Sequence, residues 1–108
     1  MFCLPQDIVP GAFRVWGLTM EHRTTPAFWR EYQRLPAETR ERADKQFALL
    51  KVNPQHSSLQ LKKVGESRAQ ELWSVRVTLS YRALALKRPE GYLWFWIGDH
   101  STYEYLIQ

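Results

Sequence analysis

The stretch that decides the fold runs from Leu72 to Leu106, LWSVRVTLSYRALALKRPEGYLWFWIGDHSTYEYL. Its first part places Trp73, Val75 and Val77 on one face, which is the period-2 pattern of a half-buried strand. Two further strand patterns follow at residues 81–86 and 92–97, and residues 88–91 between them carry a turn signal. The last pattern is apolar and aromatic almost throughout, which predicts a central strand covered on both faces. A Gly-Asp-His turn and a short helix end the stretch.

Two helices are predicted upstream of these strands. Thr25-Pro26 is a strong start signal, because the threonine hydroxyl can cap the helix and proline suits its first position. Apolar residues then recur at helical spacing, at Phe28, Trp29, Tyr32 and Leu35. Pro36 ends this helix and begins a second one, predicted over residues 37–52. A further strand is expected at residues 59–64, followed by a polar loop at 65–70. Together these elements predict an α+β domain, with an N-terminal helical hairpin packed on a small antiparallel β-sheet and a short C-terminal helix.

Composition bounds the class of protein. The 108 residues are enough for one domain, and the net charge of +4 with a pI near 9.5 is compatible with RNA, DNA or an acidic protein partner. A well-solvated basic surface is the alternative. The single cysteine, Cys3, excludes an intramolecular disulfide and favours a cytoplasmic location. No run of about 18 apolar residues occurs, so we expect no membrane span.

The first 19 residues differ from the rest in having few charges and no clear period. We predict that residues 1–19 are an N-terminal extension, not necessarily native, and that residues 20–108 form the domain. The alternative is that residues 13–18 are an edge strand packed on that domain.

The histidines lie far apart in the sequence, at His22, His56 and His100, and no pair has metal-ligand spacing. There is also no glycine-rich phosphate loop. We therefore expect neither a metal nor a cofactor.

Most of the chain from Met20 onward resembles the RelE/ParE superfamily. The residues that carry this resemblance are FWREYQRLP (28–36), LKKVG (61–65), LWSVRV (72–77), SYRALAL (80–86) and WFWIGDHSTYEYLI (94–107). The resemblance implies a RelE-like fold and a toxin of a bacterial type II toxin–antitoxin system, neutralised by a cognate antitoxin protein. RelE-like and HigB-like members are ribosome-dependent endoribonucleases that cut mRNA and so inhibit translation. ParE-like members lack a nuclease site and act on DNA gyrase.

Family motifs map onto several residues of this chain and favour the nuclease branch. Arg82 falls where these nucleases place an arginine at the scissile phosphate, and Arg76 falls where a basic strand residue lines the same groove. His100 lies in the terminal turn, where some members carry histidine. Tyr103 or Tyr105 matches the C-terminal aromatic that stacks on or polarises the nucleotide.

One position departs from the family pattern. Ser74 stands where RelE has a second basic strand residue, so a proton-transfer role is vacant there. Lys62 or Lys63 on the neighbouring strand is the predicted compensation. Lys62, Lys63, Ser74 and Tyr105 are accordingly expected to bind RNA.

The residue types suit RNA cleavage without a metal. Such cleavage needs a base for the 2′-hydroxyl proton, cations for the phosphate charge and an acid for the 5′ leaving oxygen. Imidazole, with a pKa of about 6.5, exchanges protons near neutral pH, whereas arginine stabilises charge without losing its proton. We assign proton transfer to His100 and electrostatic stabilisation to Arg76 and Arg82.

Structural alternatives exist for each of these residues. His100 can simply cap the last helix, and the two arginines can pair with Glu71 and Glu104. Trp94 and Trp96 are more typical of core than of base-stacking surfaces. At the level of the whole protein, the alternatives to a nuclease are a gyrase-type toxin and a non-toxic interaction module of the same fold.

Overall fold

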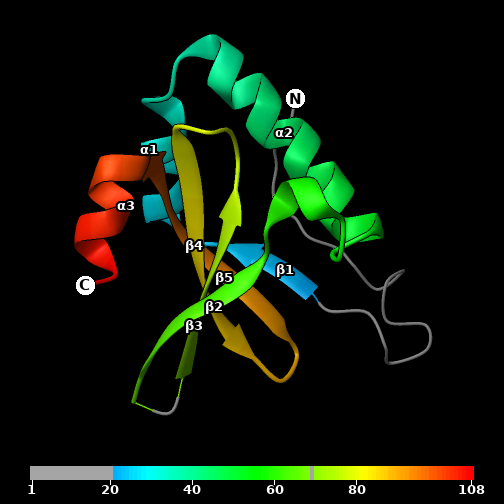
Figure 1. Cartoon of the computed structure of the whole chain (residues 1–108), viewed down its shortest axis with the longest axis vertical. Coiled ribbons are helices and arrows are strands. Elements are labelled where there is room, and N and C mark those ends of the chain that lie inside the picture. Colours follow the sequence, from blue (N-terminus) through cyan, green and yellow to red (C-terminus); the bar gives the residue numbers. More distant parts are fainter. Residues whose placement is uncertain (1–20, 69) are drawn as a thin grey trace.

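The computed structural model describes residues 21–68 and 70–108, so the predicted extension and its alternative strand lie outside the described residues. The elements follow one another as β1(Glu21–Thr24), α1(Pro26–Gln33), α2(Ala37–Val52), the 3₁₀ helix η2(Ser57–Leu59), β2(Lys62–Ser67), β3(Gln70–Arg76), β4(Tyr81–Arg88), β5(Gly91–Asp99) and α3(His100–Leu106). The predicted α+β class is confirmed (Figure 1).

The sheet has five strands in the order β1-β5-β4-β3-β2. Strands β2 to β5 form the antiparallel arrangement that the sequence predicts, and β5 lies in the interior of the sheet as expected. The prediction of a purely antiparallel sheet is wrong, because β1 pairs with β5 in parallel. β1 runs so close to β5 that a Cβ on Gly91 would collide with the Glu21 carbonyl oxygen. Glycine at this position therefore permits the extra strand.

Helices α1 and α2 begin and end close to the predicted residues. The Thr25 hydroxyl accepts a hydrogen bond from the Phe28 amide at 3.1 Å, which confirms the predicted N-cap. The two helices contact one another through the Tyr32 hydroxyl, which donates to the Asp44 carboxylate at 2.7 Å. Apolar side chains of both helices pack against one face of the sheet, and these residues include Phe28, Tyr32, Ala43, Leu50, Val75, Ala83, Trp94 and Ile97.

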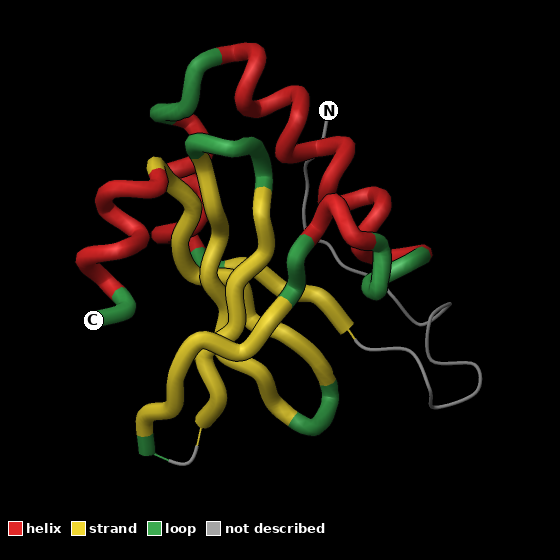
Figure 2. Tube along the Cα trace, viewed as in Figure 1, coloured by secondary structure: helices red, strands yellow, loops and turns green. Residues whose placement is uncertain are grey.

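Helix α3 covers the opposite face of the sheet. Strand residues alternate between faces, so Ser74, Arg76 and Arg82 point away from the core shared with α1 and α2. Figures 1 and 2 show α2 and α3 on opposite sides of the sheet. The chain end therefore packs on the face that carries the predicted arginines.

The segment before β3 differs from its prediction. The strand expected at residues 59–64 instead spans Lys62–Ser67, and the loop expected at 65–70 shortens to a turn. Leu59 belongs to the 3₁₀ helix η2 and is fully buried. Leu59 is buried although it precedes the strand, so the alternating pattern begins three residues before β2.

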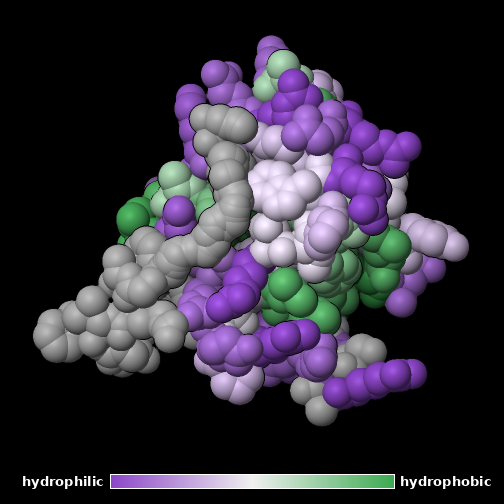
Figure 3. All heavy atoms as spheres, turned by 180° about the vertical axis from the view of Figure 1, so that it is seen from behind, coloured by the Kyte–Doolittle hydropathy of each residue, from purple (hydrophilic) through white to green (hydrophobic). Residues whose placement is uncertain are grey.

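The surface seen from behind is hydrophilic over much of its described area, with hydrophobic residues gathered in a smaller part (Figure 3). Across residues 21–68 and 70–108, none of the helices has the length and apolar character needed to cross a membrane.

Candidate functional site

Arg76 and Arg82 lie directly opposite one another on β3 and β4. Their side chains therefore emerge side by side on the face that α3 covers. Like charges at directly opposed positions destabilise an antiparallel pair, unless an anion lies between or beside them. We call the group formed by Gln60, Ser74, Arg76, Arg82 and Tyr103 the arginine site.

Arg82 is the most deeply placed charge of the arginine site, with only 8% of its surface exposed. Its Nη2 donates to the Gln60 Oε1 at 3.2 Å, and its guanidinium carbon lies 5.2 Å from the centre of the Tyr103 ring. The buried Nε and Nη1 atoms have no hydrogen-bond partner among the described residues. A buried guanidinium with N–H groups that lack a described partner is costly by itself, and an oxyanion that reached these groups would offset the cost.

Tyr103 forms the base of the arginine site. It is 3% exposed, and its hydroxyl donates to the Ser74 Oγ at 3.3 Å. Ser74 is itself fully buried and lies against Tyr103 of α3. Tyr105 points outward with 73% of its surface exposed. The structure thus separates the two tyrosines, which the sequence left open.

His100 is the first residue of α3 and is half-buried. Its backbone amide donates to the Ser80 carbonyl at 2.7 Å, its ring centre lies 5.5 Å from that of Tyr103, and its Nε2 lies 3.4 Å from a Glu104 oxygen. His100 and Arg82 therefore both contact the Tyr103 ring.

The cap of α3 is Asp99, not His100. The Asp99 carboxylate accepts a hydrogen bond from the Thr102 amide at 2.9 Å. Hydrogen bonds from the Thr102 side chain and backbone lower the pKa of Asp99. This frees His100 from the capping role that the sequence offered as an alternative.

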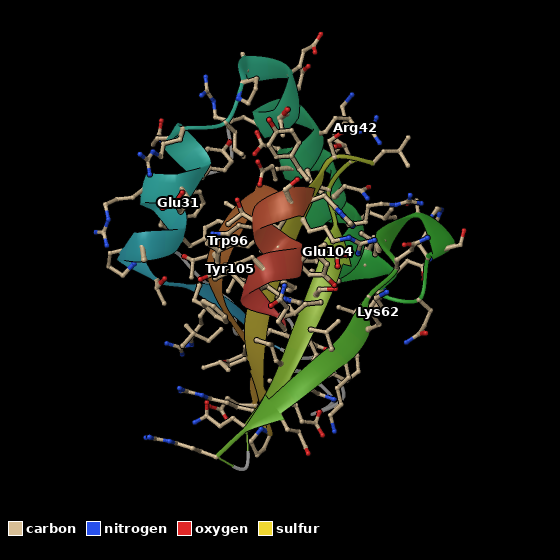
Figure 4. The ribbon with its side chains drawn as sticks, turned by 60° about the vertical axis from the view of Figure 1, so that its left-hand side comes forward. Glu31, Arg42, Lys62, Trp96, Glu104 and Tyr105 are labelled. Carbon is tan, nitrogen blue, oxygen red and sulfur yellow. The ribbon has the colours of Figure 1, made fainter. Side chains whose placement is uncertain are left out.

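The two lysines of β2 lie on different faces of the sheet. Lys62 is opposite Ser74, so it borders the arginine site, whereas Lys63 is opposite Trp73 on the other face. Lys63 there contacts Glu66 at 3.1 Å and Glu71 at 3.7 Å, and the hydrogen bond with Glu66 raises its pKa. Figure 4 shows Lys62 on the same side of α3 as Glu104, with Tyr105 on the other side. Only Lys62 is therefore brought to the predicted groove.

The two glutamates considered as partners for the arginines pair elsewhere. Glu71 lies on the opposite face, where it contacts Lys63 and accepts a hydrogen bond from Trp73, while Glu104 contacts His100. Within the described part of the chain, neither Arg76 nor Arg82 makes an ion pair. Described carboxylates therefore do not neutralise either arginine.

The two candidate tryptophans divide between core and surface. Trp94 is 2% exposed and donates to His22 Nδ1 at 3.1 Å, as expected for a core residue. Trp96 is half-buried and lies against Gly98, where a Cβ would collide with the indole ring. Gly98 is opposite Arg82, so this glycine leaves room for the indole beside the arginine site.

Sequence reasoning missed two glutamines. Gln60 holds Arg82, and the buried Gln46 of α2 donates to the Arg76 carbonyl at 2.9 Å and to the Ser58 carbonyl at 3.3 Å. Gln46 falls at a core position of α2, and a polar residue there was the available signal. No such signal exists for Gln60, which is exposed in a loop.

The arrangement can bind an anion next to a group able to exchange protons. In the part of the chain that the structure covers, no cluster of three or more His, Cys, Asp or Glu side chains could hold a metal ion.

Comparison with known proteins identifies the fold. No protein-family model matches the chain, and no curated protein matches it in sequence. Among solved structures, it is similar to a RelE–RelB complex from Pyrococcus horikoshii OT3, with a TM-score of 0.60, 14% identity, and coverage of 76% of this chain and 96% of that chain. It is similar to the RelB–RelE antitoxin–toxin complex from Methanococcus jannaschii, with a TM-score of 0.59, 14% identity, and coverage of 77% and 96%. A YoeB/ParE toxin from Agrobacterium tumefaciens gives a TM-score of 0.55 at 19% identity, with coverage of 75% and 99%. The chain therefore has the RelE-like fold of these toxins, as its sequence motifs predicted.

Proposed function

We propose that this protein is the toxin of a type II toxin–antitoxin module and that it cuts mRNA on the ribosome. The observation that carries the proposal is the Arg82 guanidinium, which is buried, not paired with any described carboxylate, and left with Nε and Nη1 unpartnered. A phosphodiester oxygen is the ligand that best satisfies these donors once the side chains that cover them move aside, because arginine binds phosphate through parallel N–H bonds.

The neighbouring residues supply the other requirements of RNA cleavage. Arg76 adds a second positive charge directly opposite Arg82, and Lys62 extends the basic surface along β2. His100 contacts the same tyrosine ring as Arg82 and offers an imidazole for proton transfer. In this proposal the 2′-oxygen attacks the phosphorus, the 5′-oxygen leaves, and His100 takes part in moving the proton between them.

The partner that follows from this proposal is an antitoxin with an acidic segment. Arg76 and Arg82, which pair with no described carboxylate, lie on one face with Lys62 and would attract such a segment, which would cover the arginine site and exclude substrate. The similar RelB–RelE structure is described as an antitoxin–toxin complex, which supports the same kind of partnership here.

The test is brief induction of the protein in bacterial cells, followed by mapping of mRNA 5′ ends by primer extension. The wild-type chain should give cuts in phase with codons, and Arg82→Ala should abolish them. Arg88→Ala is the matched control, because Arg88 is exposed at the far end of the same strand and should leave the cuts unchanged.

Two results would contradict the nuclease proposal. One is growth arrest without mRNA cuts, accompanied by broken or abnormally supercoiled DNA, which would support the gyrase-type alternative. The other is the absence of any growth arrest from an intact, folded protein, which would support a non-toxic interaction module.

A further inference from the structure

Gln60 has an unusual backbone for its residue type. It follows the 3₁₀ helix η2 with φ 45° and ψ 46°, the left-handed conformation that L side chains rarely adopt. Glycine or asparagine is the common choice at such a helix end. A glutamine held here indicates that its side chain contributes something that glycine would not.

That contribution is the hydrogen bond to Arg82, a residue 22 positions away on β4. The Gln60 Oε1 accepts from Nη2 and so fixes one end of the guanidinium fork. Nε and Nη1, at the remaining positions of the fork, stay without partners among the described residues. The amide oxygen is uncharged, so it orients the guanidinium without neutralising it.

The segment that carries Gln60 is itself anchored to the arginine site. Leu59 is fully buried, and the Gln60 amide donates to the Ser57 carbonyl at 3.3 Å. Gln46 joins the Ser58 carbonyl to the Arg76 carbonyl, so α2 ties this segment to β3 at the second arginine. The position of the Gln60 backbone relative to both arginines is therefore set by buried contacts, and its exposed side chain reaches Arg82 from there.

We propose that Gln60 is a positioning residue, which holds Nη2 of Arg82 so that the buried Nε and Nη1 stay available to a phosphate that enters when the side chains covering them move aside, while leaving the arginine charge intact. This inference rests on the proposed function in treating the ligand as a phosphodiester. A carboxylate at position 60 would also orient Arg82, but it would compete with the phosphate for the same charge.

The test measures phosphate binding directly and does not depend on RNA cleavage. Inorganic phosphate is titrated into ¹⁵N-labelled protein, and the Arg82 Nε–H resonance is followed by NMR after assignment through its loss in Arg82→Lys. The wild-type resonance should shift with phosphate. Gln60→Gly should bind phosphate about three- to tenfold more weakly, because the guanidinium is no longer held. Its melting temperature should not fall, since glycine suits the left-handed backbone.

Two further variants separate the orientation of Arg82 from two other effects, namely a change of charge at position 60 and the relief of a left-handed backbone. Gln60→Glu should keep Arg82 ordered yet weaken phosphate binding, because the new carboxylate neutralises the site. Arg68→Gly relaxes the other described non-glycine residue with positive φ, in the β2–β3 turn, and should leave the Arg82 titration unchanged.

Unchanged phosphate affinity in Gln60→Gly would overturn the inference. The same holds if the wild-type Arg82 Nε–H resonance does not shift when phosphate is added. If the titrations follow expectation but the wild-type protein cuts no mRNA, the nuclease proposal fails and the positioning role of Gln60 stands.

Discussion

Replacing Arg82 by methionine should make the protein more stable while removing its proposed activity. Methionine keeps an unbranched apolar stem of similar reach, so it can occupy the space beside Tyr103 without a buried charge. The arginine site would then lose the guanidinium that is proposed to bind phosphate, and an apolar side chain would pack in its place. Replacing a functional residue that destabilises the folded state commonly raises stability and lowers activity.

The magnitude follows from the contacts of the guanidinium. The two buried nitrogen atoms without described partners, Nε and Nη1, cost about 1–3 kcal/mol each, so removing both is worth about 4 kcal/mol. Relief of the repulsion from Arg76 adds about 0.5 kcal/mol. Against this, the variant loses about 1 kcal/mol from the bond to exposed Gln60, which water replaces, and about 1 kcal/mol from the contact with the Tyr103 ring. The net gain is about 2.5 kcal/mol, which corresponds to a rise of about 10 °C in melting temperature.

The assay is thermal unfolding with and without phosphate. At about ten times its Kd, phosphate should stabilise the wild-type protein by about 1.4 kcal/mol and leave Arg82→Met unaffected. Arg76→Met is the matched control, because Arg76 is only half-buried and its melting temperature should change little. A melting temperature for Arg82→Met several degrees below wild type, together with no phosphate effect on the wild type, would refute the reasoning.

Further predictions concern proton transfer, pH, the chain start and the partner. His100→Ala should reduce the rate of mRNA cleavage by about 10²–10⁴ without lowering the melting temperature; unimpaired cleavage by this variant would remove His100 from the mechanism. Burial, with a smaller effect from a nearby lysine, lowers the pKa of His22 from 6.5 to about 4. As the pH falls, the unfolded chain therefore takes up the proton on His22 first. Up to about 3 kcal/mol of stability is fully present above pH 6.5 and is lost as the pH falls toward 4. His22→Gln should therefore flatten the dependence of the melting temperature on pH between 6.5 and 4. A chain beginning at Met20 should keep its melting temperature, and a loss of several degrees would show that the preceding residues belong to the fold. In a calorimetric salt series, Arg76→Ala with Arg82→Ala should bind the antitoxin more weakly and with less salt dependence, whereas equal affinities would place the antitoxin elsewhere.

Elements with a local pattern were predictable from the sequence, and the edge strand β1 was not. The capped start of α1 and the strands β3 to β5 each carry their own signal, namely a threonine–proline pair, an alternation or a turn. β1 consists of only four residues, EHRT, which show no strand pattern. It is a strand because the Glu21 amide donates to the Glu90 carbonyl and the Thr25 amide to the Trp94 carbonyl, contacts that depend on the rest of the sheet.

The arginine site could be predicted in part for the same reason. Arg76 and Arg82 flank a short connection between two predicted strands, so their register follows from the hairpin. Adjacent strand residues face opposite sides, so Lys62 and Lys63 could not both line one groove. The contact of Gln60 with Arg82 depends on a left-handed backbone that the residue type does not favour. No sequence pattern encodes such a contact.

The parallel pairing of β1 with β5 has a consequence for synthesis of the chain. The first described strand finds its partner only in the last one, and His22 meets Trp94 across 72 positions. During translation, β1 must wait unpaired until nearly the whole domain has been made. Tyr103, the base of the arginine site, is added later still. A growing chain therefore cannot display the assembled site before α3 has been made, and the proposed binding of phosphate is possible only after that point.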